Sequence, residues 1–142
     1  MEVSEVRRRL RGAIEDARRR VAERRARIDE ASLAYERFLP EVAVPAFHKM
    51  IQALVGEGHR FKVQTPAQAV RLVPDRPTED YIELAFDAER DLPGLVARSS
   101  RGRGRRTIST ERPVVEHKAI ADVTEEDVVA IVLEELLPFL ER

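Results

Sequence analysis

The stretch from Val3 to Leu39 constrains the fold of this chain most, because it contains no proline and a single glycine, Gly12. Apolar residues recur along it with the period of an α-helix. They form two interleaved seams, each with a seven-residue repeat: Ile14, Val21, Ile28 and Tyr35 in one, and Val3, Leu10, Ala17, Ala31 and Phe38 in the other. This heptad pattern, interrupted by Arg7 and Arg24, predicts one long, coiled-coil-like amphipathic helix over residues 1–39.

A helix of this length would extend about 55 Å at 1.5 Å per residue, which is more than a domain of this size can cover by itself. Part of its apolar seam would then stay bare, so we expect a homo-oligomer, most simply a dimer. The residues expected at the oligomer interface are Leu10, Ile14, Ala17, Val21, Ile28 and Tyr35.

Arginines flank this seam on both sides: Arg11, Arg18 and Arg25 on one, and Arg20 and Arg27 on the other. In a parallel homodimer Arg20 would face Arg25 of the second helix, and the two like charges would repel. The seam therefore prefers an acidic partner, which leaves another protein chain open as the partner. Acids of the C-terminal segment, such as Glu134 and Glu135, are candidates within the same chain or a sister chain.

Residues 40–142 are expected to form an α+β domain. Pro40 and Pro45 should end or kink the long helix, and a second helix then runs to about Val55. Alternating or β-branched segments predict an antiparallel sheet of four to six short strands, at residues 59–65, 69–73, 81–87, 95–99 and 107–110, with 114–119 as a further candidate. Thr124 can cap a C-terminal helix, which we expect to pack on the sheet.

The clearest strand, Tyr81 to Asp87, has Ile82, Leu84 and Phe86 on one face. The same alternation predicts that Glu83 and Asp87, on the other face, point into solvent.

An arginine-rich segment at residues 98–106 is expected to form the tip of a hairpin. It contains Arg98, Arg101, Arg103, Arg105 and Arg106, with Gly102 and Gly104 between them and no acid before Glu111. Such a cluster is costly to bury, so it should be exposed. It could neutralise phosphates of a nucleic acid without reading the sequence, because no aromatic residue lies among the arginines to stack on bases. The alternative is a mobile loop that pairs with acids of its own chain or of a sister subunit.

Composition argues against most catalytic sites. The chain has no cysteine, which excludes thiolate nucleophiles, disulfides and Cys-ligated metals, and its three histidines, His48, His59 and His117, lie far apart in the sequence. No glycine-rich phosphate loop and no serine-nucleophile turn occurs. One weak alternative is Asp75 with Glu116 and Lys118, whose order resembles the layout with which metal-dependent nucleases hold magnesium. We expect no enzyme activity, no metal and no cofactor.

The sequence thus favours a non-enzymatic protein-interaction or assembly module that self-associates through its long helix. The alternative is a sequence-independent nucleic-acid-binding protein that uses the arginine-rich hairpin and the arginine-lined helix. No apolar stretch is long enough to span a bilayer, and no membrane partner is expected. The absence of cysteine and of a secretion signal fits a cytoplasmic protein.

Overall fold

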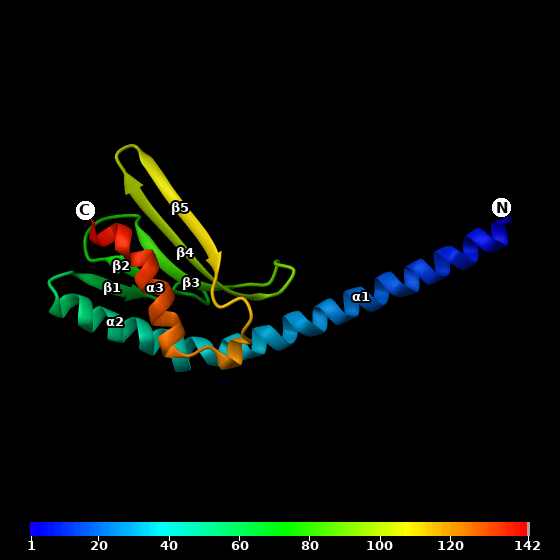
Figure 1. The fold of residues 1–142 in the computed structure, drawn as a ribbon, viewed down its shortest axis with the longest axis horizontal. Coiled ribbons are helices and arrows are strands. Elements are labelled where there is room, and N and C mark those ends of the chain that lie inside the picture. Colours follow the sequence, from blue (N-terminus) through cyan, green and yellow to red (C-terminus); the bar gives the residue numbers. More distant parts are fainter. Residues whose placement is uncertain (142) are drawn as a thin grey trace. The chain divides into compact units, whose positions relative to one another are not determined.

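The computed structural model describes residues 1–141 and has the predicted α+β fold (Figure 1). The elements, in chain order, are α1 (Val3–Phe38), the π-helical stretch η1 (Leu39–Ala43), α2 (Val44–Gly56), β1 (Phe61–Gln64), β2 (Val70–Pro74), β3 (Tyr81–Asp87), β4 (Gly94–Arg103), β5 (Arg106–Pro113), the 3-10 turn η2 (Ile120–Asp122) and α3 (Glu125–Leu140). By its internal contacts the chain divides into two compact units, Met1–Glu30 and Ala31–Arg142. The first unit consists of the N-terminal part of α1.

The two prolines that follow α1 widen the helix instead of ending it. A proline removes one N–H donor, and its ring crowds the carbonyl four residues earlier. The chain accommodates this in η1, where the N–H of Val44 donates to the carbonyl of Leu39 in the wider π-helical pattern. Helix α2 continues from there, so the helical chain runs on through both Pro40 and Pro45.

The sheet of the second unit is an antiparallel meander in the order β1–β2–β3–β4–β5. Helix α2 packs against β1 and β2, and α3 packs against β3 and β4 (Figure 1). The predicted sheet and the predicted packing of the C-terminal helix on it are therefore confirmed. β1 and β5 form the two edges of the sheet.

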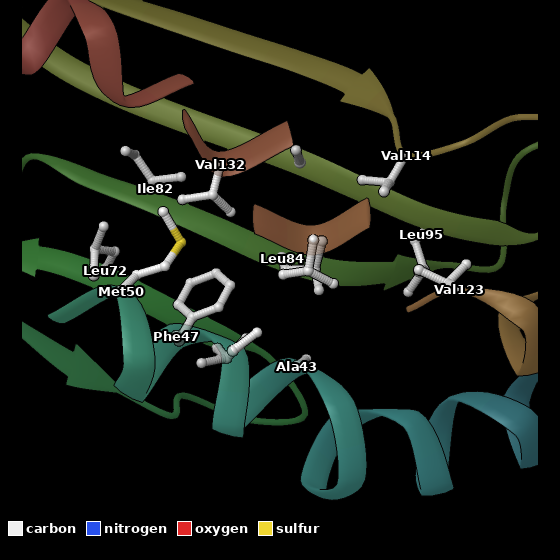
Figure 2. Packing of buried hydrophobic residues seen from close by; sticks show 14 of the residues in the cluster. Ala43, Phe47, Met50, Leu72, Ile82, Leu84, Leu95, Val114, Val123 and Val132 are labelled. Atoms are coloured by element: carbon white, nitrogen blue, oxygen red, sulfur yellow. The ribbon is translucent and has the colours of Figure 1, made fainter. Parts of the chain in front are cut away.

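The main core lies between the sheet and these two helices. Phe47 and Met50 point from α2 toward the strands, where they meet Leu72 of β2 and Ile82 of β3, while Val132 enters from α3 (Figure 2). The last turns of α1 contribute to the same core through buried Tyr35 and Phe38. A smaller cluster, Ala69, Ala85 and Val96, is buried apart from the main core. Alternation along β3 places Ala85 on the face opposite to Ile82 and Leu84.

β4 and β5 form a long hairpin closed by a two-residue turn. Arg103 pairs with Arg106 in the register, so the turn consists of Gly104 and Arg105. Gly104 has a φ of +64°, which suits the first central position of a type II′ turn. The glycine spacing noted in the sequence thus has a direct structural use, because a side chain at this position would be strained.

The candidate strand at residues 114–119 is wrong. β5 ends at Pro113, and the N–H of Val114 still donates to the carbonyl of Leu95 at 3.0 Å. Val115 then adopts a left-handed conformation with a φ of +49°, and the N–H of Lys118 closes a turn onto its carbonyl at 3.1 Å. The β-branched residues favour a strand locally, but a left-handed residue cannot continue one.

Candidate interaction surfaces

The end of the β4–β5 hairpin extends beyond its neighbour strand. Pairing of β3 with β4 stops at Tyr81 and Ser100, whereas pairing of β4 with β5 continues to Arg103 and Arg106. Beyond Ser100 the ribbon is therefore two-stranded, and Figure 1 shows this end standing clear of β1, β2 and β3. The base of this end is supported by Asp80, whose Oδ1 accepts a hydrogen bond from the N–H of Gly102 at 2.8 Å.

The arginines of this end collect on one face of the ribbon. Side chains alternate along a strand, and Arg103 lies opposite Arg106, so Arg101, Arg103 and Arg106 share a face while Arg105 lies in the turn. Arg103, Arg105 and Arg106 are exposed, and Arg101 is half-buried. Within residues 1–141 none of these four side chains forms an ion pair. We call them the tip arginines.

Arg98, the fifth arginine of the predicted set, belongs to a different arrangement. Its guanidinium lies 3.5 Å from Oε2 of Glu83 and 3.4 Å from Oε1 of Glu111. On the other side, Arg71 donates from Nε to Oε1 of Glu83 at 2.8 Å, and its guanidinium lies 4.1 Å from the ring centre of Tyr81. The four charged residues thus form a chain of ion pairs across β2, β3, β4 and β5.

Glu83 corrects the expectation of a solvent-facing carboxylate on β3. Its residue is only 7% exposed, because Arg71 and Arg98 of the two neighbouring strands bind it from both sides. Period-two alternation identified the correct face, but the register that brings two arginines beside Glu83 cannot be read from one strand. Asp87, at the end of the same strand, is half-buried.

The apolar seam of α1 is exposed in the first unit. Leu10, Ile14 and Val21 are 56%, 47% and 50% exposed, and Ala17 between them is exposed as well. A shallow groove on this helix is lined by Ile14, Ala17, Arg18, Val21, Ala22 and Arg25. We call this surface the α1 groove.

The charges around the α1 groove are unevenly paired. Asp16 binds Arg19, and Glu5 binds Arg9 at 3.3 Å, both on the polar side of the helix. By contrast, no ion pair within residues 1–141 involves the five arginines that flank the seam, which are Arg11, Arg18, Arg20, Arg25 and Arg27. The flanking positive charge is therefore available to an outside partner.

The C-terminal part of the predicted seam is not exposed like the part from Leu10 to Val21. Ile28 is half-buried, and Tyr35 is buried in the core of the second unit, where its ring stacks on Phe86 with centroids 5.4 Å apart. The hydroxyl of Tyr35 donates to the carbonyl of Gln68 at 2.5 Å. Burial, with a smaller effect from the negative charge of Glu83, raises the pKa of Tyr35 to about 12. Tyr35 thus belongs to the core of the second unit and is not available as an oligomer interface.

Helix α3 has a buried face and an exposed one. Val128, Val132 and Leu136 are buried against the sheet. On the opposite side Leu133 and Leu137 are 49% and 57% exposed. Ala130 is exposed on the same side, as are three acids, Glu126, Glu134 and Glu141. We call this surface the α3 stripe.

Arg112 of β5 holds the two central acids of α3. It donates from Nε to Glu135 at 2.6 Å and from Nη2 to Glu134 at 2.5 Å. Desolvation lowers the pKa of Arg112, but the hydrogen bonds to Glu134 and Glu135 outweigh it, so the pKa is raised. Two carboxylates share one cation, which leaves a net negative charge on the group that includes Glu134 of the α3 stripe.

Two of the nuclease-like residues, Glu116 and Lys118, lie in and after the turn that precedes α3. Lys118 donates to Oδ2 of Asp127 at 2.7 Å and so belongs to the start of α3, while Glu116 lies exposed in the preceding turn. Across the described part of the chain, no group of three or more His, Asp or Glu side chains could hold a metal ion. Within the same residues, no helix combines the length and the apolar character needed to cross a bilayer.

Three surfaces of the described residues are candidate interaction sites: the tip arginines, the α1 groove and the α3 stripe. The first two surfaces could be predicted, because runs of arginine and heptad spacing are visible in the chain. The α3 stripe was not predicted, since the C-terminal helix was expected only to pack on the sheet. No protein-family model, no curated protein and no solved structure matches this chain.

Proposed function

We propose that this chain is a non-enzymatic assembly module that self-associates through the apolar seam of α1. One observation carries the proposal: Leu10, Ile14 and Val21 are about half exposed along a helix of 36 residues. An exposed apolar seam of this kind, uninterrupted from Leu10 to Val21, marks an interaction site. Full burial of an exposed side chain of this size contributes about 1.5–3 kcal/mol, and since these side chains are already about half buried, covering the rest contributes roughly half of that for each. Several residues along the seam together can then support a dimer. A cytoplasmic location stays a prediction.

Light scattering of the purified full chain tests this proposal. At micromolar concentration we expect a mass of at least twice the chain mass of 16.2 kDa. Changing Ile14 and Val21 to Asp should reduce that mass to the monomer without altering the thermal melt of the second unit. Ala26→Asp adds a charge on the polar side of the same helix and is the matched control. A parent protein that is monomeric at micromolar concentration would contradict the proposal.

A second candidate function is sequence-independent binding of nucleic acid by the tip arginines. The observation that favours it is that four exposed or half-exposed arginines gather at the end of a two-stranded ribbon without an ion pair in residues 1–141. Guanidinium groups of this kind bind backbone phosphates irrespective of base sequence.

Absorbance of the purified protein gives a first test of this candidate. The chain has no tryptophan and only two tyrosines, so its own absorbance at 280 nm is weak and co-purified nucleic acid raises the 260/280 ratio strongly. We expect a raised ratio for the parent and a normal one after all four tip arginines are changed to Ala. A normal ratio for the parent, together with no binding to DNA or RNA at low salt, would eliminate this candidate.

A further inference from the structure

The α1 groove presents three apolar side chains bordered by arginines. Ile14, Ala17 and Val21 are spaced three and four residues apart, which places them on one face of the helix. Arg18 and Arg25 line the groove and are seven residues apart. Because seven residues are two turns of a helix, these two cations project along the same edge of the groove, about 10 Å apart.

The α3 stripe has the same spacing with the opposite charge. Ala130, Leu133 and Leu137 are spaced three and four residues apart, and the exposed acids Glu134 and Glu141 are seven residues apart along one edge. Glu134 already accepts a hydrogen bond from Arg112, but Arg112 is shared with Glu135, so this edge stays negative. The two surfaces thus match in apolar spacing and are complementary in charge.

We propose that the α3 stripe of one copy docks antiparallel in the α1 groove of a second copy. This inference rests on the proposed self-association through α1 and identifies the surface that α1 binds. In the antiparallel register that sets Leu137 against Ala17, Leu133 lies against Val21. The same register brings Arg18 toward Glu134 and Arg11 toward Glu141.

Pairing of α1 with α1 is disfavoured by the same charges. Arg11, Arg18 and Arg25 flank the seam on one side and Arg20 and Arg27 on the other, so two identical seams bring like charges together in either orientation of the helices. Docking of α3 in the groove avoids this conflict for Arg18 and Arg11, which meet Glu134 and Glu141 in this register. The small side chain of Ala17 leaves room for Leu137.

Crosslinking of introduced cysteines tests the proposed contact, and the chain's lack of native cysteine makes the background clean. Ala17→Cys and Leu137→Cys chains, one of them carrying a mass tag, are mixed and treated with a short bismaleimide. We expect a covalent dimer that contains one chain of each kind. Ala26→Cys, on the polar side of α1, mixed with Leu137→Cys is the control and should give no mixed dimer. All three positions are exposed, and unchanged thermal melts would verify that the variants fold.

The other outcomes separate this inference from the proposed function. A covalent dimer that contains only Ala17→Cys chains would show that α1 packs on α1; the docking inference would then be overturned and the proposed self-association would stand. A parent chain that is monomeric in light scattering, with no crosslinked product, would overturn both.

Reversing the charge of Arg18 should change the dissociation constant of the assembly in opposite directions for docking of α3 on α1 and for packing of α1 on α1. If α3 docks in the groove, Arg18→Glu places two acids together, and we expect the dissociation constant of the assembly to rise at least several-fold. If α1 packs on α1, the same change relieves repulsion between arginines, and the dissociation constant should fall. Arg19→Glu, on the polar side of the helix beside Asp16, is the control for the charge change. An unchanged or lowered dissociation constant for Arg18→Glu would overturn the inference.

Discussion

Arg112 on β5 donates from Nε to Oε1 of Glu135 on α3 at 2.6 Å, and this bond joins the edge strand of the sheet to the helix that covers it. The carboxylate also accepts a hydrogen bond from Thr110 at 3.0 Å, so both of its oxygens are satisfied although the residue is buried. Removing Arg112 or Thr110 alone would therefore leave a buried oxygen of Glu135 without a hydrogen-bond donor, which costs stability.

Removing the cation alone should destabilise the second unit. In Arg112→Met the apolar stem of the side chain is largely kept, but Glu135 loses its partner while it stays buried. Because Arg112 itself is partly exposed, we expect a loss of about 1–3 kcal/mol in the free energy of unfolding, below the range for a fully buried pair. Urea denaturation of the full chain measures this.

The double variant Arg112→Met/Glu135→Leu is the informative control, because it removes the charge and its partner together. We expect it to recover most of the lost stability, as apolar replacements of buried pairs commonly do. Arg9→Met, which breaks an exposed pair with Glu5 on α1, should change stability by less than about 0.5 kcal/mol. A double variant less stable than Arg112→Met would show that the pair has another structural role.

Tyr35 should make stability fall at high pH. Its pKa is raised to about 12 by burial and by the charge of Glu83, whereas the unfolded chain releases this proton near pH 10. The folded state thus binds the Tyr35 proton more tightly than the unfolded chain does. The resulting contribution to the free energy of unfolding is complete below pH 10 and is lost as the pH rises through 10 toward 12. Tyr35→Phe should lose about 1 kcal/mol at pH 7, with the hydrogen bond to Gln68.

The same variant should flatten the alkaline limb of the stability curve. We expect the difference between parent and Tyr35→Phe to shrink as the pH rises from 9 to 11, measured by urea denaturation at each pH. A difference that grows over this range would contradict the assignment.

Asp127 should contribute to stability at the acid end. The hydrogen bond from Lys118, together with the one from the N–H of Thr124, lowers the pKa of Asp127 below its usual value. A lowered pKa in the folded state means that this stabilisation is complete above about pH 4 and is lost as the pH falls through the folded pKa. Asp127→Asn should therefore be less stable than the parent at pH 7, with the difference narrowing below pH 4 in thermal melts. An equal difference at pH 7 and pH 3 would rule this out.

Much of the fold could be predicted from local pattern. β3 has the bounds that alternation indicated, Tyr81–Asp87. Helix α1, Val3–Phe38, lies within the long helix predicted over residues 1–39 and ends one residue before it. What could not be predicted depends on contacts between distant segments. The burial of Glu83 requires Arg71 and Arg98 to lie beside it, and only the sheet register places them there.

The candidate site was predictable to the same extent. A heptad pattern says that Tyr35 and Ile14 lie on one face of a helix, but it cannot tell whether that face is covered by the chain's own sheet or by a second chain. Tyr35 is covered by the core of its own unit, whereas Ile14 is exposed. The α3 stripe could not be predicted for a related reason. A broad apolar helix face can lie partly in a core and partly on the surface, and composition alone does not show which residues lie in which.

The tip arginines include two like charges that face each other. Arg103 and Arg106 are directly opposite each other in the hairpin, where two like charges cost about 0.2–1 kcal/mol. Changing both to Ala should therefore leave the free energy of unfolding unchanged or raise it slightly. If the tip binds phosphates, the affinity for a single-stranded DNA of arbitrary sequence should fall. The slope of log K against log salt should become shallower by roughly 1.4, since each lost contact removes about 0.7 of a counterion from the exchange.

Arg37→Ala/Arg60→Ala is the matched control, because it removes the same charge from exposed positions outside the tip. Fluorescence anisotropy between 25 and 200 mM salt distinguishes the two pairs. If the slope flattens equally in both, the effect comes from net charge and the tip is not a specific phosphate site. If the tip variant instead binds DNA as the parent does but loses mass in light scattering, the arginines contact acids of a second copy. A flattened slope in the tip variant alone, with the assembly intact, is the result that phosphate binding requires, because only then do the unpaired guanidinium groups act on a polyanion and not on the protein itself.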